Sequence, residues 1–192
     1  MTISVLIPVP SDAVRPSAMS PRLASLKGKV VGVMYNAKGN AEPMLTFIAD
    51  NLKAQYGAEV LAPVRTRGVY LPDAEQFQAM ASKADVVLVG LGDCGSCSAC
   101  SIELAADFER AGVPAVAICT TPFLRAGQAM AARQGMPDLP FVTLQHPLSS
   151  LDTAELRQRA EVAAPQAAAM LLASLGGEDA ALSQQWRQSR TG

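Results

Sequence analysis

An alternation of short apolar segments with amphipathic ones constrains this chain more than any other feature. The segment 85–92, DVVLVGLG, is almost wholly apolar, as expected of a parallel strand that is buried on both faces. Four further segments are largely apolar and predict strands, at 30–36, 59–64, 114–120 and 141–145. Segments with helical spacing or helix-forming composition alternate with them and predict helices, at 41–56, 73–83, 98–111, 122–134 and 152–174.

This alternation, with short connections, predicts an α/β protein. We expect a three-layer, doubly wound parallel sheet of about five strands, in the flavodoxin-like order 2-1-3-4-5. A dinucleotide-binding fold would need more strands. The loop after the first strand, Asn36-Ala37-Lys38-Gly39-Asn40, also lacks the G-x-G-x-x-G phosphate fingerprint, so neither NAD nor ATP is supported as a cofactor.

The chain is expected to have three parts. Residues 1–28 are rich in Pro and Ser and predict an extended N-terminal arm, which is either disordered or lies across a neighbour. Residues 29–174 form the α/β domain, and residues 175–192 a polar C-terminal tail. Because the arm contains the apolar stretch ISVLIPV, we expect a homo-oligomer or a subunit of a hetero-oligomer.

Composition narrows the possible partners and the compartment. Lys and Arg number 16 against 17 Asp and Glu, so the chain has no basic excess with which to bind nucleic acid. No apolar run approaches the roughly 20 residues of a membrane span, and the opening segment lacks the cationic region of a signal peptide. We therefore expect a cytoplasmic protein whose cysteines remain available as thiols and whose partner is a small-molecule substrate.

The segment GDCGSCSAC, residues 92–100, holds three of the four cysteines. Cys94 falls where a strand becomes a helix, and the unpaired N–H groups of a helix N-terminus favour the thiolate. Cys97 lies three residues further, on the same side of the helical turn and within reach of a disulfide with Cys94. Gly92 and Gly95 permit close approaches that larger residues would resist. The pattern predicts a nucleophile, Cys94, with a resolving partner, Cys97.

Ligands of open parallel sheets bind beyond the carboxyl ends of the strands, where several other polar residues are expected. Asp93 and His146, the only histidine, are predicted to manage protons as catalytic residues beside the thiols. The residues predicted to bind substrate or shape the pocket are Asn36, Lys38, Gly95, Ser96, Thr120 and Thr121. Arg65 and Arg67 are read as a solvated edge.

Other interpretations of these residues remain open. Cys94, Cys97 and Cys100 could together hold a metal, but helical spacing spreads their sulfurs along an axis, so no metal is favoured. Cys119, in AVAIC, is expected to be a small buried hydrophobe. A lone histidine such as His146 is as often a packing or capping residue as a catalytic one. A non-redox lyase or hydrolase, with a covalent thio-adduct on Cys94, is the main alternative to redox chemistry.

Four segments resemble the UGSC family, whose motif begins with selenocysteine in some members and cysteine in others. The motif here is Cys94-Gly95-Ser96-Cys97, within GLGDCGSCSACS. Residues 31–45, 108–123 and 146–160 are similar to other segments of the family, and the resemblance spans roughly residues 30–172.

The resemblance implies that Cys94 occupies the position with the highest demand for a reactive thiolate. Selenoprotein subunits of glycine and proline reductases are distantly similar, which implies reductive cleavage of carbon–heteroatom bonds. We accordingly expect a thiol-dependent enzyme that needs no bound cofactor and is regenerated by an external dithiol reductant. A metal-binding or sulfur-handling subunit without catalysis of its own is the remaining alternative.

Overall fold

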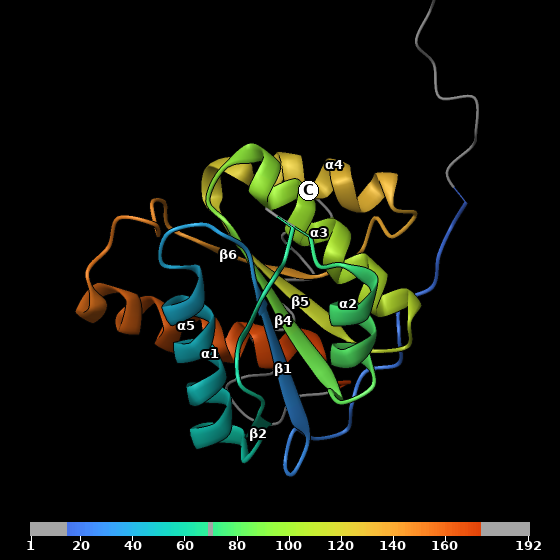
Figure 1. Ribbon diagram of the computed structural model, residues 1–192, viewed down its shortest axis with the longest axis horizontal. Helices are drawn as coiled ribbons and strands as arrows, with labels where there is room; N and C mark the ends of the chain where they lie inside the picture. The colour runs from blue at the N-terminus through green and yellow to red at the C-terminus, as the bar shows by residue number, and fades with distance from the viewer. Residues whose placement is uncertain (1–14, 69–70, 174–192) are drawn as a thin grey trace, which may run out of the picture.

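The computed structural model describes residues 15–68 and 71–173. Within them, a parallel sheet carries the strands in the order β2-β1-β4-β5-β6, and β3 pairs with β1 at the same edge as β2 (Figure 1). The strands are β1 (Val30–Tyr35), β2 (Glu59–Val60), β3 (Val64–Arg65), β4 (Val86–Gly92), β5 (Ala115–Thr120) and β6 (Phe141–Leu144). When β2 and β3 are counted as one edge strand, this is the predicted order, and the predicted α/β class is confirmed.

Helices cover both faces of the sheet. They are α1 (Ala41–Tyr56), α2 (Ala74–Ala81), α3 (Gly95–Arg110), the 3₁₀ turn η1 (Thr121–Phe123), α4 (Leu124–Arg133) and α5 (Thr153–Leu171). Helices α1 and α5 pack on one face, and α2, α3 and α4 on the other (Figure 1). Every residue of β4 and of β5 is buried, because each of these strands has helices above and below it.

The edge next to β1 differs from the expected single strand at 59–64. It breaks into β2 and β3 around residues 61–63, where the chain leaves β1 and returns. Pro63 has no N–H to donate to a ladder, and such residues are confined to edges and irregular segments of sheets. The break is therefore a local consequence of sequence that leaves the sheet order unchanged.

Helix α3 begins at Gly95, three residues before the predicted start. The Cys94 side chain accepts a hydrogen bond from the backbone N–H of Cys97, so cysteine takes the capping position that Ser, Thr, Asp or Asn usually fills. The cysteine motif therefore lies inside the first turn of the helix rather than in a loop before it.

The described part of the N-terminal arm, residues 15–28, packs on the chain's own domain, and contact of the arm with a neighbouring chain stays a prediction. Leu26 is 1% exposed and belongs to the core beneath α1 and α5. Leu23 forms a parallel bridge with Leu172, with N–H to carbonyl bonds of 3.0 Å to Leu171 and 2.9 Å from Ala173. Residues 1–14 of the arm, and the predicted tail, lie outside the described residues.

A buried carboxylate fixes the arm to the far end of α3. The Glu109 side chain is 0% exposed and pairs with Arg22 across 2.7 Å. It also accepts backbone N–H bonds from Ser20, at 2.7 Å, and from Ala115, at 2.9 Å. The charge is thus fully satisfied, as a buried carboxylate requires.

None of the helices in the described ranges is long and apolar enough to cross a bilayer.

Candidate thiol–disulfide site

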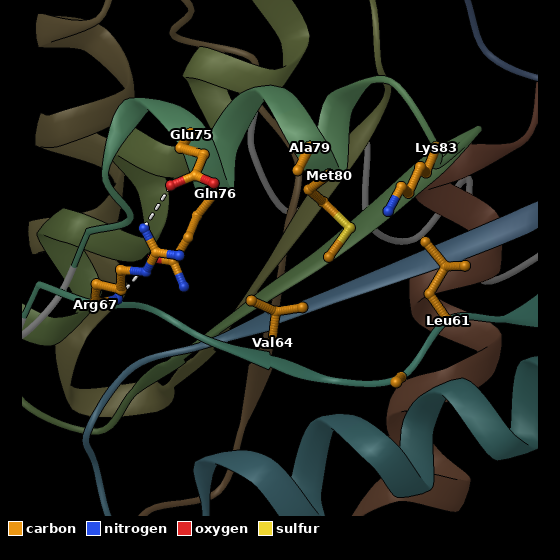
Figure 2. Close-up of a pocket in the computed structure, with 9 residues that line it drawn as sticks. Leu61, Val64, Arg67, Glu75, Gln76, Ala79, Met80 and Lys83 are labelled. Atoms are coloured by element: carbon orange, nitrogen blue, oxygen red, sulfur yellow. Dashed lines mark hydrogen bonds and ion pairs between the residues drawn. The ribbon is translucent and has the colours of Figure 1, made fainter.

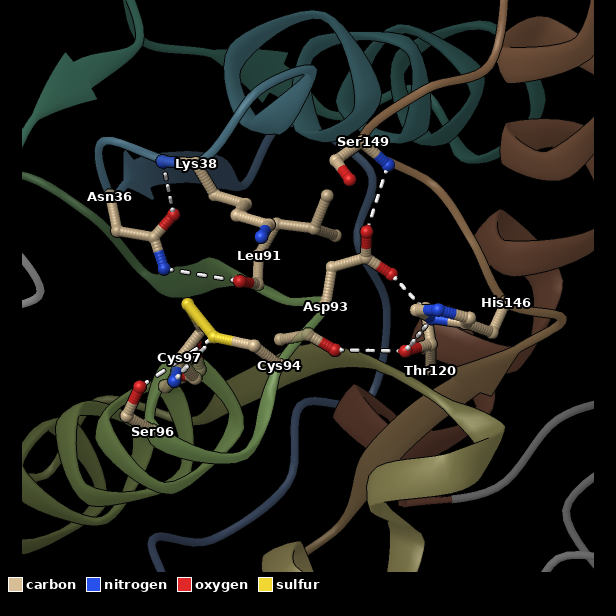
Figure 3. Close-up of a disulfide and its surroundings, with 12 residues drawn as sticks. Asn36, Lys38, Leu91, Asp93, Cys94, Ser96, Cys97, Thr120, His146 and Ser149 are labelled. Carbon is tan, nitrogen blue, oxygen red and sulfur yellow. Dashed lines mark hydrogen bonds and ion pairs between the residues drawn. A yellow bond between two sulfur atoms is a disulfide. The ribbon is translucent and has the colours of Figure 1, made fainter.

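Residues from four strand ends meet at the carboxyl edge of the sheet (Figure 3). The loop after β1 contributes Asn36 and Lys38, and β4 leads into Asp93 and the cysteine motif. Thr120 ends β5, and His146 follows β6. Because β1 and β4 are neighbours in the sheet, the loops after them face each other, as the predicted strand order requires.

Cys94 and Cys97 form a disulfide, with their Cα atoms 5.2 Å apart. The two sulfurs differ in access. Cys94 is partly exposed, whereas Cys97 is only 2% exposed. The Cys94 sulfur also lies 3.6 Å from the Ser96 hydroxyl. An external molecule thus meets the Cys94 sulfur first, and the Cys97 sulfur lies behind it. The lowered pKa that we expect of the reduced Cys94 thiol stays a prediction.

The segment 92–100 contains two glycines, and only Gly92 has a packing role. A Cβ at Gly92 would lie 2.6 Å from the Cys119 sulfur and 2.8 Å from the Ser98 hydroxyl, so no larger side chain fits between β4 and α3. Gly95 would place a Cβ in open space and lies exposed in the first turn of α3. Within the described ranges no residue outside its own helix approaches Gly95, and a close approach by a substrate stays a prediction.

Asp93 is buried beside the disulfide, with its side chain 1% exposed. Its two oxygens accept backbone N–H bonds from Leu148, at 3.2 Å, and from Ser149, at 2.9 Å. Burial alone would raise the pKa of Asp93, but hydrogen bonds from the Ser149 hydroxyl and from these two amides hold it below its usual value. Asp93 is consequently an ionised acceptor at neutral pH.

His146 lies on the open side of Asp93, with its side chain 38% exposed. Its Nδ1 is 3.0 Å from Asp93 Oδ1 and 3.2 Å from the Thr120 hydroxyl. The Thr120 hydroxyl in turn donates to the Gly92 carbonyl at 3.2 Å. The Phe123 ring stands edge-on to the imidazole, with ring centroids 5.8 Å apart. The structure thus brings together three of the predicted residues, Asp93, Thr120 and His146.

Asn36 has a structural position rather than an open one. It is 2% exposed, its amide nitrogen donates to the Leu91 carbonyl at 3.1 Å, and its amide oxygen accepts from the Lys38 N–H at 3.1 Å. These bonds fix the β1–α1 loop to the end of β4. The Lys38 side chain runs from that loop toward Leu91, between Asn36 and Asp93 (Figure 3).

The remaining predicted substrate-binding residues lie on the surface. Gly95, Ser96 and Thr121 are exposed, and Thr121 begins the 3₁₀ turn. Ser149 was not predicted, although it supplies two of the hydrogen bonds that hold Asp93. The only sequence signal for it is the Ser-Ser pair that follows His146-Pro147-Leu148, and this pattern also fits an ordinary turn.

The other two cysteines stand apart from the disulfide. Burial and then the charge of Glu103 raise the pKa of Cys100. Cys119 is fully buried, as predicted, and burial raises its pKa to about 12 even though Ser98 opposes the shift. Among the described residues, no group of three or more His, Cys, Asp and Glu side chains is arranged to hold a metal ion.

A separate groove of about 400 Å³ lies between α2 and the broken edge of the sheet (Figure 2). Leu61 and Val64, from the edge of the sheet, and Met80, from α2, line it with apolar side chains, and Lys83 lies at one end. Arg67, at the other end, pairs with Asp73 and Glu75 across 2.8 Å, as a solvated edge residue would. None of the groove's lining residues belongs to the thiol site.

Comparison with solved structures finds, among others, a diflavin flavoprotein A3 from Nostoc sp.. It is 11% identical to this chain, with a TM-score of 0.40 over 85% of this chain and 97% of the other. No curated protein matches this chain. The UGSC family, in contrast, matches residues 4–173, which extends the resemblance into the N-terminal arm that was expected to lie outside it. The chain therefore belongs to the UGSC family.

Proposed function

We propose that this protein is a thiol-dependent enzyme in which Cys94 and Cys97 cycle between dithiol and disulfide while a bond in a small molecule is cleaved reductively. The observation that carries the proposal is the Cys94–Cys97 disulfide, with the partly exposed sulfur at the helix start and the buried one behind it. A nucleophile needs access and a resolving thiol needs proximity, and this arrangement supports both.

The reaction starts from the reduced pair and a substrate R–X, where X is a heteroatom group. The Cys94 thiol passes its proton to His146, and the resulting thiolate attacks the carbon of R. The Cys94 S–C bond forms, and X leaves with the bonding electrons and takes that proton from His146. The Cys97 sulfur then attacks the Cys94 sulfur. The disulfide forms, and R leaves with the S–C electron pair and takes up the proton that the Cys97 thiol gives up. Two thiols thus give two electrons and two protons, and the products are R–H, H–X and the disulfide.

The second step sets a condition on the substrate. Because R departs with an electron pair, it needs a neighbouring group, such as a carbonyl, that stabilises a carbanion. An external dithiol then attacks the Cys94 sulfur, releases the Cys97 thiol, and leaves as its own disulfide after its second thiol attacks the mixed disulfide. The cytoplasm, where thiols are kept reduced, is the setting that suits this cycle.

The first test of the proposal is a redox titration of the full chain. The protein is equilibrated with mixtures of oxidised and reduced dithiothreitol, quenched with acid, denatured in the presence of a thiol reagent and weighed intact. The oxidised form should take up label at Cys100 and Cys119 only, and the reduced form at all four cysteines. We expect a reversible couple that C94S and C97S each abolish and that C100S, the matched control, leaves unchanged.

A disulfide that native protein never exchanges with dithiothreitol would contradict the redox cycle. Once a substrate is found, C94S should lose activity completely. Turnover by C97S without any reductant would instead favour the lyase or hydrolase with a thio-adduct on Cys94.

A further inference from the structure

The Asp93, Thr120 and His146 side chains form a chain of hydrogen bonds whose direction can be worked out. The Gly92 carbonyl can only accept a hydrogen bond, so the Thr120 hydroxyl donates its single proton to that carbonyl. The Thr120 oxygen therefore presents lone pairs, not a proton, to His146 Nδ1 at 3.2 Å. An ionised Asp93 also presents only lone pairs to the same nitrogen, at 3.0 Å.

Both neighbours of Nδ1 are thus acceptors, and Nδ1 must carry a proton to satisfy them. The opposite tautomer would set the Nδ1 lone pair against a buried carboxylate oxygen. A buried carboxylate oxygen that loses a donor pays a desolvation cost, which the His146 N–H avoids. Asp93 cannot turn away, because its oxygens also accept the backbone N–H groups of Leu148 and Ser149.

The exposed edge of the imidazole is the edge that carries Nε2. Since Nδ1 faces Asp93, which is 1% exposed, and Thr120, which is 0% exposed, the 38% of the His146 side chain that remains exposed lies opposite, at the edge that carries Nε2. Nε2 makes no hydrogen bond within the described ranges of the chain. A neutral His146 then has its lone pair on the accessible nitrogen.

We infer that Asp93 and Thr120 are positioning residues that hold His146 as the Nδ1–H tautomer, and that Nε2 is the atom through which the site exchanges protons. This revises the expectations that Asp93 is catalytic and that Thr120 binds substrate, because both side chains are buried and act through the imidazole. The role of Nε2 in proton exchange rests on the proposed function, whereas the tautomer does not.

Because His146 is the only histidine, long-range ¹H–¹⁵N correlation spectra of the ¹⁵N-labelled full chain report on it without assignment of any other ring. The spectra are recorded above the pH at which the imidazole loses its charge. We expect the Nδ1–H form to exceed the Nε2–H form by about tenfold or more, since a hydrogen bond to an ionised group is worth more than one imidazole–water bond. A spectrum dominated by Nε2–H would overturn the inference.

Three variants separate positioning from mere packing. Asp93→Asn should shift the population toward Nε2–H, because the amide no longer offers an ionised acceptor. Thr120→Val should shift it in the same direction, and Thr120→Ser, which keeps the hydroxyl, should restore the wild-type spectrum. If Asp93→Asn does not fold, the wild-type spectrum still decides the tautomer and the two Thr120 variants decide the positioning.

An unchanged tautomer ratio in every folded variant would refute the positioning role. None of these measurements uses a substrate or a reductant. A failure of the redox titration with the expected tautomer intact would therefore count against the proposed function alone.

Discussion

Replacing Glu109 with Gln tests how strongly the arm is fixed to the domain. One Glu109 oxygen accepts from both Arg22 and Ala115, and the other accepts from the Ser20 N–H. A glutamine side chain must place its NH₂ group where one carboxylate oxygen was. The least costly orientation puts this NH₂ group opposite the Ser20 N–H, so that two hydrogen-bond donors face each other. At least one buried donor then lacks a partner.

The magnitude follows from these bonds. One unsatisfied buried donor costs about 1–3 kcal/mol, and the Arg22 bond loses its charge assistance, which adds roughly 1 kcal/mol. We expect Glu109→Gln to lower the free energy of unfolding by about 2–4 kcal/mol. Arg22→Met should cost about 1–3 kcal/mol, which is less than the full penalty for an unpaired buried charge because the carboxylate keeps both amide donors.

The assay is urea unfolding of the full chain, read by circular dichroism, for the two single variants and the double variant. The double variant should cost less than the sum of the single ones, because the two side chains share one interaction. Arg110→Met is the matched control. Arg110 lies next to Glu109, but its pair with Asp107 is 36% and 46% exposed, so its removal should stay within about 0.5 kcal/mol.

The reasoning would be refuted by a Glu109→Gln protein within about 0.5 kcal/mol of the wild type, or by an Arg22→Met protein no less stable than Arg110→Met.

Three further predictions concern the site and its helices. Because its pKa is lower in the folded chain than in the unfolded one, Asp93 stabilises the fold above its unfolded pKa, and that contribution is lost as the pH falls through the lower, folded value. Unfolding free energies measured below about pH 5 should therefore fall less steeply in Asp93→Asn than in the wild type. Cys119, with a pKa of about 12 and no exposure, should be the last thiol that iodoacetamide alkylates in the reduced native protein, and mass mapping that finds it among the first would contradict its burial. Gly92→Ala should destabilise the chain by about 1–3 kcal/mol in thermal unfolding, because its Cβ would overlap the Cys119 sulfur, whereas Gly95→Ala, the control in open space, should cost at most about 0.5 kcal/mol.

The sheet was largely predictable because its signal is local. An unbroken apolar run such as 85–92 can only be satisfied by burial on both faces, and the strand order then follows from the number of strands and their short connections. The edge at 59–64 is predicted as one strand, although Pro63, which cannot donate to a ladder, marks the position of its break. The start of α3 was misplaced because a cysteine cap looks in sequence like any other cysteine.

The sequence predicts which residues form the site, but it does not predict the hydrogen bonds that hold them. Cys94, Cys97 and Asp93 adjoin one strand end, so their proximity follows from the chain itself. The support of Asp93 by the loop at 148–149 joins residues more than fifty positions apart, and no local pattern encodes it. The same holds for one of the two bonds of Asn36: its bond from the Lys38 N–H is a local turn bond, whereas its bond to the Leu91 carbonyl joins positions 55 residues apart.

The bridge between Leu23 and Leu172 places the first and the last described segments of the domain side by side. A chain that begins at residue 29 would lose the Leu23 backbone bonds to Leu171 and Ala173, and it would also lack Leu26 in the core. A truncated version of the chain should therefore begin before Leu23 and Leu26, the residues through which the arm packs on the domain. A circular permutant that links the two ends and opens an exposed turn elsewhere should keep the fold.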